Sequence, residues 1–201
     1  MSERSEVARR GPGRRPGGAD TRGEILAAAR ASFAARGYDG TTLRGVARDA
    51  EVDPALVHHY FGGKEQLFVA AMELPFNPAV AVPAVIAGDI DELGERFVRF
   101  FLSIWDDPVK REPFLALMRS AAGHEQAAAM MREFVTSALL ARLAAEIDLP
   151  DARLRVAAAA AQLIGVAMLR YIIQVEAIAS ASEDELVALL APTVQRYLTG
   201  S

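Results

Sequence analysis

The hydrophobic positions recur at helical spacing along nearly the whole chain, and no segment shows the strict alternation of a half-buried strand. In residues 20–36, for example, Ile25, Leu26, Ala29 and Phe33 fall on one face of a helix. Further helices, separated by Gly, Pro and Asp, are predicted at about 64–74, 79–87, 91–105, 112–122, 125–147, 151–178 and 183–198. The pattern therefore predicts an all-α fold.

Residues 41–64 predict two short helices joined by a tight turn and followed by the start of a third. Thr41 or Thr42 can cap the first through its hydroxyl oxygen. Asp53 can cap the second, with Pro54 at its first position, where an amide proton would be unpaired anyway. The inward-facing side chains of this second helix are expected to be Val57, Tyr60 and Phe61. Two such helices form a helix-turn-helix, which can place its second helix in the DNA major groove, although an ordinary helical hairpin has the same local pattern.

The same region carries a longer motif at fixed spacing, made of Gly37, Tyr38, Thr41, Thr42, Val52, Val57, His58, Tyr60, Phe61, Lys64 and Leu67. Over about residues 20–72 this motif resembles the DNA-binding segment of the TetR/AcrR family of regulators. Two positions depart from the family pattern: Glu51 stands where the turn usually has Gly, and His58 where Tyr is most common. The resemblance implies an N-terminal three-helix DNA-binding domain and a larger C-terminal helical domain for ligand binding and dimerisation.

The resemblance also implies DNA contacts at nine positions: Thr42, Arg44, Pro54, Ala55, Leu56, His58, His59, Tyr60 and Lys64. The residue types suit this role. Small apolar side chains can contact thymine methyl groups, and imidazole can donate to a purine acceptor or a phosphate. Lys64 stands at a helix start, where free amides and a positive charge can meet a phosphate. For the two histidines, packing against the domain is the alternative.

Charge is distributed unevenly along a chain whose net charge is −4. Residues 1–19 carry five Arg against two Glu, residues 20–68 are nearly neutral, and residues 69–201 hold most of the negative charge. We therefore predict three parts: a disordered basic arm at 1–19, a DNA-binding domain at 20–68, and a helical domain at 69–201 that faces away from DNA. The arm either follows DNA phosphates or is only a solvated tail.

Two stretches near the C-terminus suggest a homodimer. Residues 156–169 contain no charge, so the helix predicted at 151–178 is apolar nearly all round and needs cover on most sides. At 14 residues this uncharged run is shorter than the roughly 20 that a membrane span requires. Together with the helix at 183–198 it can form a four-helix bundle between two subunits, or simply the core of one. The family resemblance favours the homodimer.

The C-terminal half is also rich in aromatic and Met side chains, which line adaptable apolar pockets but equally fill ordinary cores. The candidates for a ligand pocket are Phe97, Phe101, Trp105, Phe114, Met118, Met130, Phe134, Met168 and Tyr171. The resemblance implies that such a pocket holds a small-molecule inducer. The residues do not identify that molecule.

Few residues suggest any other chemistry. The chain has no Cys, and its three histidines cannot converge on a metal, because His58 and His59 are adjacent on a helix and His124 is distant. We find no phosphate-binding loop or nucleophile elbow, and no apolar leader segment. We therefore expect no enzyme activity, cofactor or metal, and a cytoplasmic location.

These observations predict a ligand-responsive, sequence-specific regulator of transcription that binds double-stranded DNA at a palindromic operator. The resemblance favours a repressor released by a small apolar or amphipathic molecule, although the residues also fit an activator. Two alternatives remain at this level. One is a DNA-organising protein with little sequence preference, and the other is a helical ligand-binding or interaction module whose helix-turn-helix is inert.

Overall fold

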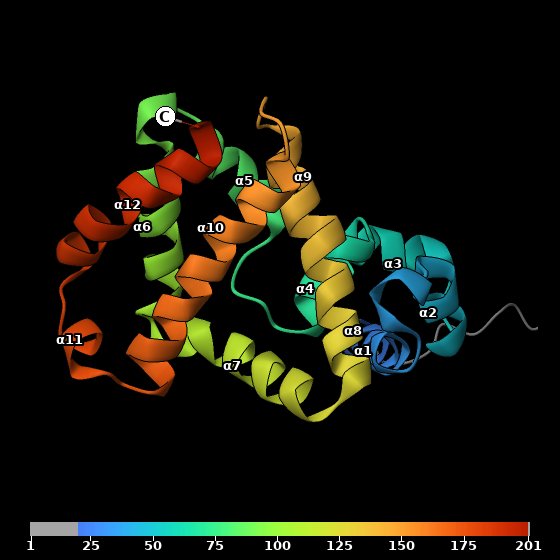
Figure 1. Ribbon diagram of the computed structural model, residues 1–201. Coiled ribbons are helices and arrows are strands. Elements are labelled where there is room, and N and C mark those ends of the chain that lie inside the picture. The colour runs from blue at the N-terminus through green and yellow to red at the C-terminus, as the bar shows by residue number, and fades with distance from the viewer. Residues whose placement is uncertain (1–19, 201) are drawn as a thin grey trace, which may run out of the picture.

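The computed structural model describes residues 20–200, and the predicted basic arm lies outside the described residues. Every regular element in the described part is helical (Figure 1), which confirms the all-α prediction. The first helices are α1 (Thr21–Gly40), α2 (Leu43–Asp49), α3 (Pro54–Phe61), α4 (Lys64–Ala71) and α5 (Pro78–Ile86). They are followed by a 3-10 turn (Ile90–Glu92), α6 (Leu93–Trp105), α7 (Pro108–Gly123), α8 (Glu125–Phe134), a π-helical turn (Val135–Leu140) and α9 (Ala141–Ala145). The chain ends with α10 (Ala152–Ala167), a second π-helical turn (Met168–Ile172), α11 (Glu176–Ala179) and α12 (Glu183–Thr199).

Local signals set the ends of the first helices. Gly37 interrupts α1 with a positive φ of 72°, a conformation that glycine adopts without steric cost. Thr42 accepts a hydrogen bond from the Gly45 amide and so caps α2, which decides between the two threonines considered. Asp53 accepts from the Ala55 amide and caps α3, with Pro54 at the first position, as predicted.

The N-terminal helices share a hydrophobic core with α8. Phe33 of α1, Val57 of α3 and Phe68 of α4 are buried in one cluster that also contains Met130 and Phe134. The rings of Phe68 and Phe134 stack with centroids 4.3 Å apart. The prediction that Met130 and Phe134 line a ligand pocket is therefore wrong, because both side chains fill the junction between α8 and the first four helices.

A second core lies between α6, α10 and α12. Val98 and Leu102 of α6, Val156 and Leu163 of α10, and Val194 of α12 are all buried within it. The helices α6 and α12 approach closely at Gly94, where an added Cβ would lie 2.6 Å from the Ala191 carbonyl oxygen. This close packing gives the C-terminal half its own rigid frame.

Several predicted boundaries differ from the structure: α1 continues to Gly40 rather than 36, and α4 ends at Ala71 rather than 74. The helix α7 begins at Pro108 rather than 112, because the Asp107 carboxylate accepts from the Val109 and Lys110 amides and caps it. The helix expected at 151–178 ends at Ile172 with the π-helical turn, and α11 is separate. Arg170 donates to the carbonyl oxygens of Ile178 and Ala181, which folds the following segment back. The helix expected at 125–147 ends at Ala145 and contains the first π-helical turn.

Candidate nucleic-acid interface and ligand cavity

The outer face of α3 is solvent-exposed, while two side chains fix its inner face. Val57 and Phe61 are buried beneath α3. The exposed side chains are those of Pro54, Ala55, Leu56, His58, His59 and Tyr60. Tyr60 is 41 % exposed, so the prediction that it points inward is wrong. Tyr60 is thus exposed like the other predicted DNA contacts of α3, and its phenol is available to contact DNA.

A polar network joins α1 to α2. The buried Ser32 hydroxyl donates to the Thr41 hydroxyl over 3.1 Å, and the Thr41 hydroxyl donates to the Gly37 carbonyl oxygen over 2.8 Å. Arg36 donates to both Ser32 and Asp49, and this contact with the guanidinium lowers the pKa of the Asp49 carboxyl group. Sequence reasoning missed these residues, because nothing in the linear pattern pairs Arg36 with Asp49.

On α2, Thr42 and Arg44 are exposed. The Thr42 hydroxyl oxygen accepts from the Gly45 amide, which leaves the hydroxyl proton available for an external acceptor such as a phosphate. Lys64 lies at the start of α4. Its Nζ is 3.2 Å from the Asp39 carbonyl oxygen and 4.6 Å from the centre of the Tyr38 ring.

The pKa of Tyr38, whose ring lies beside the Lys64 ammonium group, differs from that of a free tyrosine. Burial, with a contribution from the carboxylates of Glu65 and Asp39, raises the pKa of Tyr38 to about 12. The phenol therefore stays neutral at physiological pH, and its ring stacks against Phe33 and meets Phe68 edge-on. This aromatic group places the start of α4, and with it Lys64, beside the turn that precedes α2.

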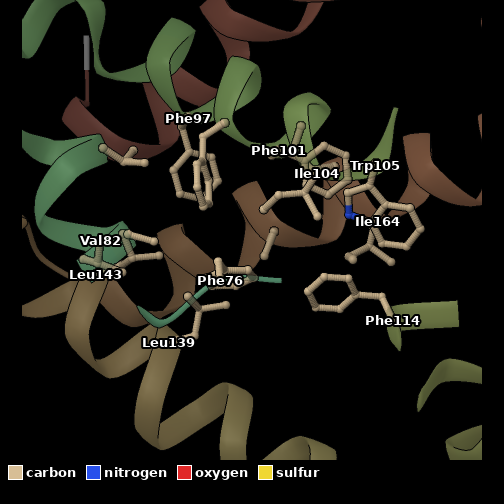
Figure 2. A pocket seen from close by; sticks show the side chains of 15 residues that line it. Phe76, Val82, Phe97, Phe101, Ile104, Trp105, Phe114, Leu139, Leu143 and Ile164 are labelled. Carbon is tan, nitrogen blue, oxygen red and sulfur yellow. The ribbon is translucent and has the colours of Figure 1, made fainter. Parts of the chain in front are cut away.

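An apolar cavity of about 140 Å³ lies in the C-terminal half, surrounded by fifteen apolar side chains (Figure 2). Four of the predicted pocket residues line it: Phe97, Phe101, Trp105 and Phe114. Met118 and Tyr171 do not line it and instead pack beside Trp105, and Met168 lies in the second π-helical turn. The prediction missed several lining residues, including Phe76, Leu139, Leu143, Ala160 and Ile164. They come from a loop, the first π-helical turn, α9 and α10, whose convergence has no signature in the sequence.

Both halves of the chain match family models. Residues 25–71 match the model described as "Bacterial regulatory proteins, tetR family". Residues 91–198, more than half of the chain, match the model described as "Tetracyclin repressor-like, C-terminal domain". The chain belongs to the TetR family. It is therefore a DNA-binding regulator rather than an enzyme, as the sequence predicted.

Individual known proteins resemble the chain to different extents. A TetR-family regulator of known structure from Streptomyces coelicolor is 40% identical, with 93% of this chain and 99% of that chain covered and a TM-score of 0.48. The transcriptional repressor NicS of Pseudomonas putida is 30% identical over 108 residues, which are 52% of this chain and 50% of NicS. The regulator BetI of Brucella anthropi is 45% identical over 51 residues, 25% of this chain and 26% of BetI. The chain thus spans about half the length of NicS and about a quarter of BetI in these matches.

The last long helices of this TetR-family chain carry exposed apolar side chains. On α10, Leu154 is 70 % exposed and a Cβ added at Gly165 would meet no atom within 4 Å. On α12, Leu189 is 73 % exposed. The segment Ala152–Ile172 is long and apolar enough to cross a membrane by length and composition alone, a test that core helices of soluble proteins also pass. TetR-family regulators are typically cytoplasmic and homodimeric.

Proposed function

We propose that this protein is a ligand-responsive transcriptional repressor that binds a palindromic operator as a homodimer. One observation carries the proposal: an exposed α3, anchored from beneath by Val57 and Phe61, and an apolar cavity occur in the same TetR-family chain. In this proposal residues 20–68 read DNA, and residues 69–201 dimerise and hold the ligand. The cytoplasm, where the operator is located, is the proposed site of action.

The proposed DNA contacts are those that the family resemblance implies, and the exposure of α3 and the chemistry of the residues support them. The helix α3 enters the major groove, where the Leu56 side chain meets thymine methyl groups and the His58 imidazole meets a purine acceptor or a phosphate. Ala55, Pro54, His59 and Tyr60 complete the exposed surface of α3. Thr42 and Arg44 on α2, and Lys64 on α4, bind phosphates on either side and fix the register.

Two subunits would pair through α10 and α12. The exposed Leu154 and Leu189 side chains would be buried by the same helices of a second copy, which gives a four-helix bundle. A two-fold dimer presents two copies of α3 to one side of the duplex. Its half-sites must then lie about 34 Å apart, one turn of DNA, or a multiple of that distance.

The cavity limits the chemistry of the ligand. Its volume of about 140 Å³ is close to the roughly 150 Å³ of an apolar cavity that binds benzene. All fifteen lining side chains are apolar, so a buried charge on the ligand would lack a partner. The inducer, or the part of it that enters the cavity, is therefore an uncharged apolar group about the size of one aromatic ring.

The test begins with selection of an operator from random duplexes, followed by fluorescence anisotropy at a stated salt concentration. We expect tight binding to the selected duplex at two subunits, or a multiple of two, per site. A scrambled duplex should bind far more weakly. His58→Ala should change the preferred sequence, whereas His124→Ala, an exposed histidine remote from α3, should not. Equal binding to selected and scrambled duplexes would instead indicate a DNA-organising protein and refute the proposal.

Ligand response is tested with bromobenzene, an apolar probe of suitable size that quenches tryptophan fluorescence through its heavy atom. Trp105 is the single tryptophan in the sequence, and it lines the cavity. Saturable quenching should accompany weaker binding of the selected duplex. Quenching without saturation, or saturable quenching with no effect on DNA affinity, would refute the ligand-responsive part of the proposal.

A further inference from the structure

One helical segment contacts both the cavity and the DNA-binding helices. Residues 125–145 form α8, the first π-helical turn and α9 in direct succession, and Figure 1 shows them as one column running from beside α1 toward α5. Leu139 and Leu143 on this column line the cavity. Phe134 and Ala138 on the same column belong to the core of the N-terminal helices.

The side chains that line the cavity and those that contact the N-terminal helices lie in two neighbouring rows along residues 125–145. Met130, Phe134, Ala138 and Arg142 follow one another at intervals of four, which places them in one row along a helix. Leu139 and Leu143 form the adjacent row, also four apart. Cavity-lining and domain-contacting positions are thus direct neighbours in the chain, at 138 and 139 and again at 142 and 143.

The row that faces the N-terminal helices ends in an ion pair with α4. Arg142 Nη2 lies 2.6 Å from Glu65 Oε2, and the Glu65 side chain is only 12 % exposed. The second oxygen, Oε1, is buried and makes no hydrogen bond to any residue that the structure describes. The Arg142 side chain is 42 % exposed, whereas the Glu65 carboxylate is shielded, so losing the pair leaves a charge largely buried on α4.

Glu65 lies close to the DNA-reading surface in the chain. It is the second residue of α4, directly after Lys64, and only Gly62 and Gly63 lie between α3 and α4. A second polar contact reinforces the link: Glu133 Oε2 accepts a hydrogen bond from the Asp39 amide over 2.9 Å. Residues 125–145 thus contact the turn before α2 and the start of α4, on both sides of the helix-turn-helix.

We propose that Arg142 is the positioning residue through which occupancy of the cavity reaches the recognition helix α3. This inference rests on the proposed function, because it assigns the route of the ligand response. A molecule in the cavity displaces Leu139 and Leu143, and the helical backbone carries the displacement to the adjacent Arg142. Because Glu65 is held by Arg142, the start of α4 moves with it. Lys64 and the end of α3 then leave the position that fits DNA.

The ion pair is better suited to this task than the apolar contacts around it. Stacked rings such as those of Phe68 and Phe134 can slide past each other at small cost, since dispersion contacts have little directional preference. A charged hydrogen bond of 2.6 Å to a shielded carboxylate fixes distance and direction. The π-helical turn at Val135–Leu140, beside the cavity, is a backbone irregularity of the kind that often occurs at functional sites.

Thermodynamic reciprocity provides the test, because a ligand that weakens DNA binding must itself be bound more weakly when DNA is present, by the same factor. We would measure the dissociation constant of bromobenzene by Trp105 quenching in the full chain, with and without saturating selected duplex. The wild-type ratio of the two constants should be about fivefold or more. In Arg142→Gln and in Glu65→Gln the ratio should fall below about twofold, while bromobenzene affinity of the free protein is unchanged.

Three further variants separate positioning from simple destabilisation. Arg132→Gln removes an exposed arginine from the same segment, where it pairs with Glu125 at 3.5 Å, and should keep the wild-type ratio. Arg142→Lys retains the charge and should recover part of the ratio that Arg142→Gln loses. The double variant Arg142→Gln with Glu65→Gln should lose no more than either single variant.

The outcomes distinguish the two proposals. If the wild-type ratio is one, the ligand-responsive function fails, and the inference fails with it. If the wild type shows coupling and both Arg142→Gln and Glu65→Gln retain it, only the inference is overturned. The inference is also overturned if Arg132→Gln reduces the ratio as much as Arg142→Gln. Circular dichroism spectra verify that each variant is folded, and Arg142→Lys supplies the measurement if the Gln variants are not.

Discussion

Two adjacent alanines on α10 should respond in opposite ways to the same enlargement. Ala160 lines the cavity, whereas Ala159 is fully buried in the C-terminal core. Ala160→Leu adds three carbon atoms where no protein atom is present, a gain of at most roughly 2.4 kcal/mol at about 0.8 per buried methylene group. Lost side-chain rotamer freedom subtracts about 0.5–1 kcal/mol from that gain. Ala159→Leu has no such space, and overpacking of this kind costs about 1–3 kcal/mol.

We therefore expect the free energies of unfolding of the two variants to differ by about 1–5 kcal/mol, with Ala160→Leu at or above the wild type. Urea denaturation followed by circular dichroism measures this difference, at one fixed subunit concentration because dimerisation contributes to stability. Ala160→Leu should also weaken bromobenzene binding by at least about tenfold, since it occupies the cavity. Equal destabilisation by both substitutions, or unchanged bromobenzene affinity in Ala160→Leu, would refute the conclusion that Ala160 borders a ligand-binding cavity.

The remaining predictions concern DNA binding, assembly and pH. Asp53→Ala removes the cap of α3 and should cost about 1 kcal/mol of stability, with weaker DNA binding by anisotropy; unchanged values would show that the cap is dispensable. Lys64→Ala should weaken binding to all duplexes uniformly and reduce the salt slope by about one, and a changed sequence preference would contradict a phosphate contact. Leu189→Glu should shift the chain from dimer to monomer in light scattering; a dimer that persists would exclude α12 from the interface. Because the pKa of Tyr38 is raised from 10.0 to about 12, stability present below pH 10 should be lost as pH rises from about 10 to 12. The Tyr38→Phe variant should lose less stability than the wild type over this pH range, as measured by thermal unfolding. Equal losses of stability would contradict the raised pKa of Tyr38.

The helix-turn-helix could be predicted in detail because its boundaries depend on local chemistry. Thr42, Asp53 and Pro54 act through atoms within three residues of their own position, so the sequence alone reveals them. The same chemistry was available for α7, where Asp107 and Pro108 repeat the pattern of Asp53 and Pro54. If Asp and Pro are taken only to separate helices, the start of α7 is predicted at 112, four residues too late.

The cavity could not be predicted in the same way, because a cavity forms only where side chains from several elements leave space between them. Phe97 and Phe134 are both aromatic residues on apolar helix faces, and the sequence gives no reason to separate them. Phe134 lies against Phe68, which fills the space beside it, whereas the Phe97 ring borders space left open between α5, α6, α9 and α10. That difference arises from how these four helices pack together, which no local sequence pattern reveals.

The same reasoning explains why Arg142 was not recognised from the sequence. A single arginine near the end of a predicted helix normally indicates a solvated side chain, and pairs of this kind on the surface contribute little. Its importance depends on two facts that only the fold provides: Glu65 is shielded from water, and the neighbouring Leu143 lines the cavity. Because two neighbours on one helix face different halves of the molecule, binding in one half can change the position of groups in the other without any loop or hinge between them.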